Sequence, residues 1–203
     1  MNKVNGFLYG LLSSASFGLI PLFTIPAMHQ GMPFWSILLY RFLFAMLALA
    51  CILLLDKQSF RIRRKEILPL LLLAFLYDCS AVFLFWGYKF MSSGVATTIH
   101  FMYPLAVALA MMGFFGEKRS FAILFAVLVS LSGAGLLSSG KIDFEGGNTT
   151  IGLIAAGLSV FFYGGYIVGV RKSRAVQIPS TALTCYVMGL GALFFIIGCL
   201  LYT

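Results

Sequence analysis

Long apolar runs separated by short polar breaks are the main pattern of this chain. Seven runs reach the roughly 20 residues that a helix needs to cross a hydrocarbon core. They cover residues 6–28, 34–55, 67–88, 94–115, 121–139, 151–170 and 180–202. Runs of this length favour helices over the strands of a membrane barrel, which need only about 10 alternating residues. The pattern therefore predicts an all-α, multi-pass transmembrane bundle of about seven helices.

Composition agrees with a membrane protein. Hydrophobic residues make up 61% of the 203 residues, and charged residues make up only 10%. Because a soluble domain carries about 25% charged residues, a soluble chain of this composition lacks polar side chains to cover its surface. A bilayer removes that need, since lipid is itself an apolar solvent.

Basic residues gather in alternate breaks between the runs. With the N-terminus in the cytoplasm, outer segments hold only Lys89 and Lys141. Inner segments then hold eleven, which are Lys3, Lys57, Arg61, Arg63, Arg64, Lys65, Lys118, Arg119, Arg171, Lys172 and Arg174. The positive-inside rule therefore predicts a cytoplasmic N-terminus and an extracytoplasmic C-terminus for this chain. We expect it in a bacterial cytoplasmic (inner) membrane, in contact with membrane lipids. Basic residues in short loops do not make the folded basic face of a nucleic-acid binder.

The two ends of the chain align with each other at an offset of 146 residues. Pro33 then falls on Pro179, and Tyr40 falls on Tyr186. Five predicted spans separate the two copies, and an odd number reverses the orientation of the second copy. Inverted repeats of this kind are typical of secondary transporters. The pattern predicts a five-helix repeat whose second copy stops after two helices.

Several local motifs follow one another along the chain, and they are Tyr40-Arg-Phe42, the segment 92–98, Tyr103-Pro104 and Gly116-Glu117. In this order they resemble the EamA group of the drug/metabolite transporter superfamily. Their order and spacing fit one five-helix unit at residues 1–139 and a partial second unit at residues 140–203. The resemblance implies ten helices and the export or exchange of a small metabolite.

Compared with that family pattern, the chain lacks the last three helices. We therefore expect the faces that carry Asp78, Thr97 and His100 to need a cover of lipid, a partner chain or a second copy. Lipid is the costly choice for an ionisable group at mid-membrane. A second chain or a second copy would then supply the missing helices.

Three ionisable residues lie inside predicted spans, where charge is costly. From the span ends, Arg41, Asp78 and His100 lie roughly 10, 15 and 9 Å deep at 1.5 Å per residue. All three share the outer half of the bilayer, and we expect Arg41 and Asp78 to pair, directly or through water. Such a pair either fixes helix packing or handles substrate or protons. His100 is either a neutral imidazole bonded to a neighbour or a gating or binding residue.

Two prolines interrupt the backbone hydrogen bonds inside the spans. Pro104 cannot donate to the carbonyl of His100, and Pro21 cannot donate to that of Phe17. Such irregular backbone is tolerated where it faces protein or a watery cavity. The candidate substrate-binding residues are Arg41, Asp78, Thr97, His100, Pro104, Ser14, Pro21 and Tyr163. For the single hydroxyl side chains, hydrogen bonding between helices is the competing interpretation.

No catalytic or nucleotide-binding motif is found in the sequence. The sequence therefore favours a transporter that exports or exchanges a small metabolite, such as an amino-acid-like solute, by alternating access. The alternatives are a non-transporting membrane subunit or scaffold and, more distantly, an intramembrane enzyme. An enzyme would need His100 and Asp78 within hydrogen-bond reach of each other. We assign no cofactor and no metal.

Overall fold

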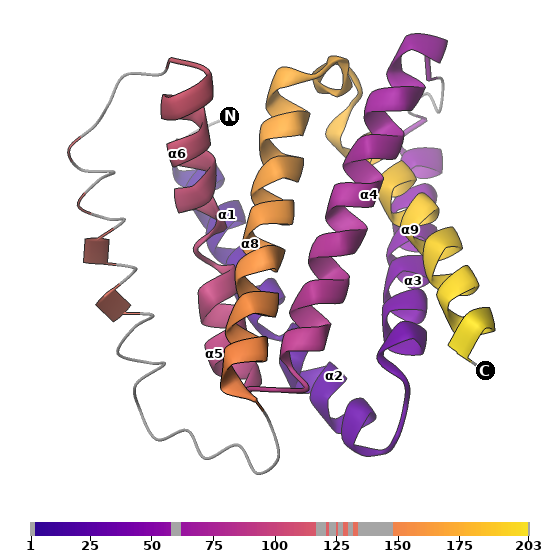
Figure 1. The fold of residues 1–203 in the computed structure, drawn as a ribbon. Coiled ribbons are helices and arrows are strands. Elements are labelled where there is room, and N and C mark those ends of the chain that lie inside the picture. Colours follow the sequence, from indigo (N-terminus) through magenta and orange to yellow (C-terminus); the bar gives the residue numbers. More distant parts are fainter. Residues whose placement is uncertain are drawn as a thin grey trace.

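Nine helical segments make up the described part of the chain (Figure 1). The computed structural model describes residues 3–57, 62–116 and 148–202, together with residues 121, 125, 128, 129, 132 and 133. The segments are α1 (Lys3–Gly18), α2 (Ile20–His29), α3 (Phe34–Leu55), α4 (Arg64–Gly87), α5 (Ser93–His100), α6 (Tyr103–Phe114), α8 (Thr149–Lys172), η1 (Arg174–Gln177) and α9 (Ser180–Tyr202). The all-helical prediction is confirmed for these residues.

Six stretches within the described residues are long and apolar enough to cross a membrane. They correspond to the predicted spans other than 121–139. That predicted span lies largely outside the described residues. A multi-pass membrane bundle is therefore confirmed.

The first and fourth spans are each built from two helices. α1 ends at Gly18 and α2 begins at Ile20, while α5 ends at His100 and α6 begins at Tyr103. Pro21 and Pro104 lie at the first turn of α2 and α6, where the missing N–H of proline does least harm. The predicted interruptions are thus confirmed. In the aligned second copy, Ile167 takes the place of Pro21, and α8 runs without a break.

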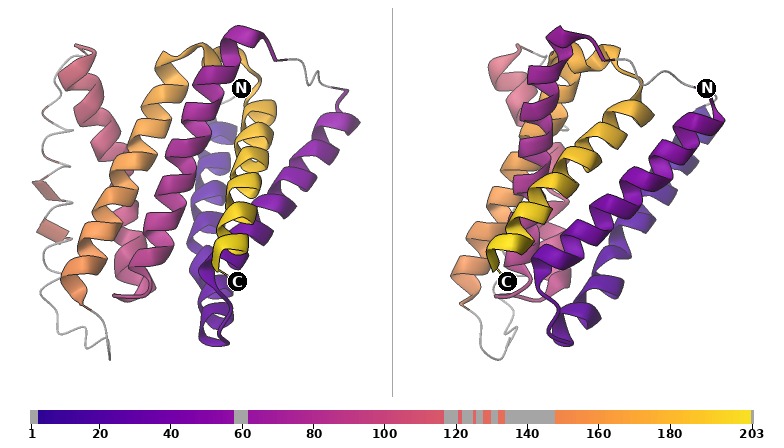
Figure 2. Two further views of the ribbon diagram at one scale, coloured as in Figure 1. Left: turned by 45° about the vertical axis from the view of Figure 1, so that its right-hand side comes forward. Right: turned by 90° about the vertical axis from the view of Figure 1, so that its right-hand side faces the viewer.

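Close helix packing holds the bundle together. α8 lies along α4 and also contacts α5 and α6, while α9 lies along α3 and contacts α4; Figures 1 and 2 show these neighbours. Glycines allow the approach. A Cβ at Gly169 of α8 would lie 2.6 Å from Leu73 Cδ2, and a Cβ at Gly198 of α9 would lie 2.7 Å from Trp35 Cε3.

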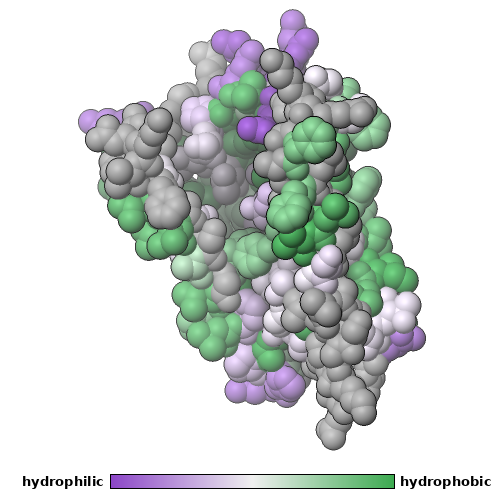
Figure 3. Space-filling view, turned by 90° about the vertical axis from the view of Figure 1, so that its left-hand side faces the viewer, coloured by the Kyte–Doolittle hydropathy of each residue, from purple (hydrophilic) through white to green (hydrophobic). Residues whose placement is uncertain are grey.

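The outer surface of the bundle is strongly apolar. Large side chains such as Leu55, Phe114 and Leu201 are more than 80% exposed. On the face in Figure 3, hydrophobic residues gather mainly in the middle and hydrophilic residues at the two ends. Lipid tails would cover such a middle band without cost.

Candidate functional site

The breaks in the first and fourth spans lie against each other. Phe17, one residue before the end of α1, stacks on His100, the last residue of α5. The ring centroids are 5.6 Å apart and the ring planes differ by 4°. Phe17 also packs against Phe101, within the second break, with centroids 5.4 Å apart. Two helix interruptions therefore meet through aromatic side chains, and we call this region the double break.

His100 is the polar centre of the double break. Its side chain is 1% exposed, and its Nδ1 lies 2.9 Å from Oγ of Ser159 on α8. The hydroxyl of Ser159 donates to the carbonyl of Ala156 at 2.6 Å. Ser80 of α4 donates to the backbone carbonyl of Ser159 at 2.9 Å. Hydrogen bonds at Ser159 thus join α4, α5 and α8 around the histidine.

Tyrosines extend the site from His100 toward α4. Tyr163 lies edge-on to His100, with ring centroids 5.2 Å apart, and edge-on to Tyr103 at 4.5 Å. Tyr77 contacts both Tyr163 and Tyr166, at 5.8 and 5.1 Å. Tyr163, one of the candidate substrate-binding residues from the sequence, is therefore part of a four-tyrosine cluster, which we call the tyrosine cluster.

The direct ion pair expected between Arg41 and Asp78 is not formed. Asp78 is 3% exposed, and its Oδ1 has no hydrogen-bond partner among the described residues. It faces Gly191 of α9, where an added Cβ would meet both Asp78 Oδ1 and the ring of Phe42. Oδ1 of Asp78 is therefore packed against α9. A water-bridged pair stays a prediction.

Arg41 lies on α3, and its side chain is half-buried. Asp78 and His100 make no hydrogen bond to each other within the described residues. The geometry required for an enzyme that uses this pair is therefore absent there.

The other candidate residues from the sequence differ in their burial and in their contacts. Thr97 is buried and its Oγ1 lies 3.0 Å from the hydroxyl of Tyr88, so it contributes to contact between α4 and α5. Pro104 is exposed on the outer surface and Pro21 is half-buried. Both act through the backbone break rather than as cavity walls. The side chain of Ser14 lies outside the described residues.

Comparison with protein families gives a match over most of the chain. The model of the EamA-like transporter family matches residues 4–139, which is more than half of the chain. The chain belongs to the EamA-like transporter family. The resemblance inferred from its motifs is thereby confirmed, and the family points to a membrane transporter of the drug/metabolite type rather than an enzyme. No curated protein and no solved structure matches the chain.

The EamA-like chain covers its own buried polar residues. We expected the faces that carry Asp78, Thr97 and His100 to need a cover of lipid, a partner chain or a second copy. The three side chains are already buried within this chain, while further helices from a second chain or copy stay a prediction. Gly191 of α9 covers Asp78, and Ser159 of α8 covers His100. α8 packs onto α4, α5 and α6, and α9 packs onto α3 and α4, because glycines and small residues permit close contact.

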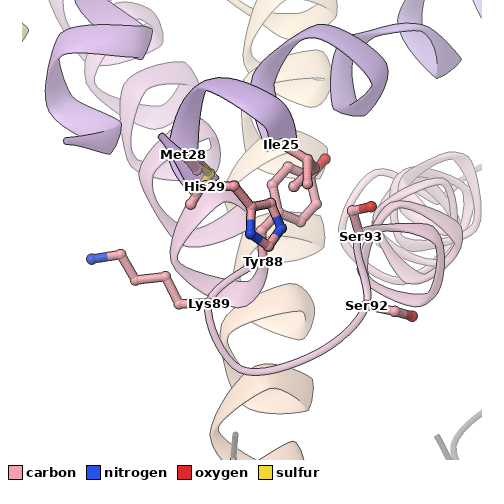
Figure 4. A pocket seen from close by; sticks show the side chains of 7 residues that line it. All are labelled: Ile25, Met28, His29, Tyr88, Lys89, Ser92 and Ser93. Carbon is pink, nitrogen blue, oxygen red and sulfur yellow. The ribbon is translucent and has the colours of Figure 1, made fainter. Parts of the chain in front are cut away.

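A separate pocket of about 340 Å³ opens at the end of the EamA-like bundle where α2 ends and α5 begins (Figure 4). Ile25, Met28, His29, Tyr88, Lys89, Ser92 and Ser93 line it. The ammonium of Lys89 points away from the imidazole of His29 (Figure 4) and lies 4.7 Å from the ring centroid of Phe34. Tyr88, which lines this pocket, is also the residue whose hydroxyl contacts Thr97.

Sequence reasoning missed Ser80 and Ser159 as site residues. Each is a small hydroxyl residue within an otherwise apolar run, a pattern that fits simple helix packing equally well. The offset of 146 residues aligns Ser159 with Ser13, but this alignment does not identify the residue that Ser159 contacts. Only the packing of α8 against α5 brings Ser159 to His100.

Proposed function

We propose that this EamA-like chain exports or exchanges a small polar solute and binds it at the double break, beside His100 and the tyrosine cluster. The observation that carries the proposal is the stacking of Phe17 on His100, because it brings two interrupted helices together inside the membrane. Secondary transporters place their solute and ion sites at such interruptions.

Polar backbone groups at the double break support the proposal. Pro104 offers no N–H to the carbonyl of His100, and Pro21 offers none to the carbonyl of Phe17. No hydrogen bond from the described residues to either carbonyl is recorded. Unsatisfied backbone at membrane depth is stable where it meets protein or a watery cavity. A polar solute that binds there supplies hydrogen-bond donors to these carbonyls.

The charged and polar groups of the bundle suit a zwitterionic, amino-acid-like solute. Arg41, a half-buried cation on α3, favours a carboxylate on the solute. The free carbonyls and the tyrosine faces favour a donor or an ammonium group. Alternating access would expose this site to the two sides of the membrane in turn.

The distribution of charge along the bundle supports a cytoplasmic N-terminus within the proposal. Arg64 and Lys65 begin α4 at the same end of the bundle at which Arg171 and Lys172 close α8 (Figure 1). Lys89 lies at the opposite end. The positive-inside rule assigns the richer end to the cytoplasm.

Counterflow in vesicles tests the proposal. The purified chain is reconstituted with unlabelled amino acids inside, and a ¹⁴C-labelled amino-acid mixture is added outside. We expect label to accumulate at least tenfold above protein-free vesicles, and the exchanged amino acids to raise the melting temperature of the protein. No exchange and no thermal shift with any amino acid would contradict the proposal and favour a membrane scaffold.

A further inference from the structure

Ser159 has only one proton to donate, and the structure shows where it goes. Its Oγ lies 2.6 Å from the carbonyl oxygen of Ala156, a distance that two oxygen lone pairs without a shared proton would not keep. The hydroxyl proton therefore lies on the bond to Ala156. Oγ of Ser159 then has only lone pairs left for His100, so Nδ1 of His100, 2.9 Å away, must be the donor.

This assignment fixes the other ring nitrogen. When the neutral imidazole carries its proton on Nδ1, Nε2 presents a bare lone pair. Nε2 of His100 is buried and has no hydrogen-bond partner among the described residues. A buried acceptor without a donor is costly, and such groups in native proteins call for an explanation.

We infer that Ser159 is a positioning residue that holds His100 in its Nδ1–H form, so that Nε2 accepts a hydrogen bond from an N–H group of the solute. The part of the inference that concerns the solute rests on the proposed function. The part that concerns the tautomer of His100 does not. The first part adds a specificity rule, because a solute whose nitrogen is fully methylated cannot donate to Nε2. Phe17 and Tyr163 hold the ring from its face and its edge.

Nitrogen NMR of the reconstituted protein tests the tautomer directly. The chain has two histidines, so in the His29→Gln variant the imidazole ¹⁵N signals come from His100 alone. We expect the proton on Nδ1. In Ser159→Ala it should move to Nε2, the form that free imidazole side chains favour. Ser159→Cys keeps the volume and offers a weaker acceptor, so it should lower the Nδ1–H fraction.

Ser80→Ala is the matched control, because it removes a hydrogen bond to the same residue but not the bond to His100. Its spectrum should keep the proton on Nδ1. A proton on Nε2 in the His29→Gln parent, or an unchanged Nδ1–H form in both Ser159 variants, would overturn the inference.

Counterflow with paired probes tests the specificity rule. Each amino acid that the vesicles exchange is compared with its N,N,N-trimethyl derivative, which keeps the carboxylate and the positive charge but has no N–H. We expect the parent protein to exchange the amino acid at least tenfold faster, and Ser159→Ala to reduce this ratio. Equal rates in the parent would contradict the rule. If no amino acid is exchanged, the proposed function and the rule fail together, while the NMR result on the tautomer stands by itself.

Discussion

The ring of Phe17 lies parallel to the imidazole of His100, with planes 4° apart. Phe17 lies one residue before the end of α1 and His100 is the last residue of α5, and a proline follows each of them four residues later. Stacking of flat rings tolerates sliding better than interlocked aliphatic side chains do, so it suits a contact between segments that move. The Phe17–His100 contact therefore lies where the two proline-associated interruptions meet, at the proposed site of solute exchange.

Replacing Pro104 tests whether the interruption is needed. In Pro104→Ala the backbone N–H can bond to the carbonyl of His100 and join α5 to α6. Because alanine restores this backbone donor and is compatible with a helix, the variant should be as stable as the parent or more stable. Counterflow should fall at least tenfold.

Pro69→Ala is the control, since Pro69 lies within α4 and causes no break. Its counterflow should stay within twofold of the parent. Full activity of Pro104→Ala, with a rise in stability, would show that the second break plays no part in exchange.

The contact of Gly191 with Asp78 and Phe42 predicts a stability effect. An added Cβ at Gly191 would overlap both side chains, and overpacking of this kind costs about 1–3 kcal/mol. We expect Gly191→Ala to lower the melting temperature of the purified protein. Gly157→Ala is the matched control, because no atom lies within 4 Å of its Cβ position. That variant should be neutral or slightly more stable, since alanine favours a helix.

A double-mutant cycle tests the relation between Arg41 and Asp78. If Arg41 and Asp78 paired as expected from the sequence, Arg41→Gln would partly rescue Asp78→Asn, because breaking a buried pair costs more than deleting it. The structure, in which Asp78 Oδ1 has no partner among the described residues, instead predicts additive effects on unfolding free energy, within about 0.5 kcal/mol. A coupling free energy of several kcal/mol, as expected for a buried ion pair, would show that Arg41 and Asp78 interact.

Single cysteines at the two ends of α8 test the orientation. Asn148 and Ser173 cap the helix, so they should lie on opposite sides of the membrane. With the N-terminus in the cytoplasm, Asn148→Cys should react with an impermeant thiol reagent from outside, and Ser173→Cys should not. The reverse pattern would overturn the orientation drawn from the basic residues.

Much of the fold was predictable because its signals are local. Run length sets the number of spans, and Pro21 and Pro104 set the position of the breaks by removing particular backbone donors. The family resemblance also rested on short motifs such as Tyr103-Pro104. Each of these depends on neighbours in the chain.

Partnerships between helices were harder to predict. Depth alone placed Arg41 and Asp78 at similar levels, but depth does not say which face of a helix a side chain occupies. Asp78 lies against Gly191, a residue more than 100 positions away. Ser159 likewise meets His100 only through the packing of α8. The site therefore depends on the rotation of each helix about its own axis. Hydrophobic runs of nearly uniform polarity do not determine this rotation.

Counterflow by the variant His100→Phe tests the central claim most directly. Phenylalanine keeps a flat ring for stacking on Phe17 but removes both nitrogens, so the fold and the aromatic contacts should survive. The account predicts a correctly folded protein, with a melting temperature close to that of the parent, whose exchange of labelled amino acids falls at least tenfold. Exchange by this variant at the rate of the parent would contradict a solute site at His100.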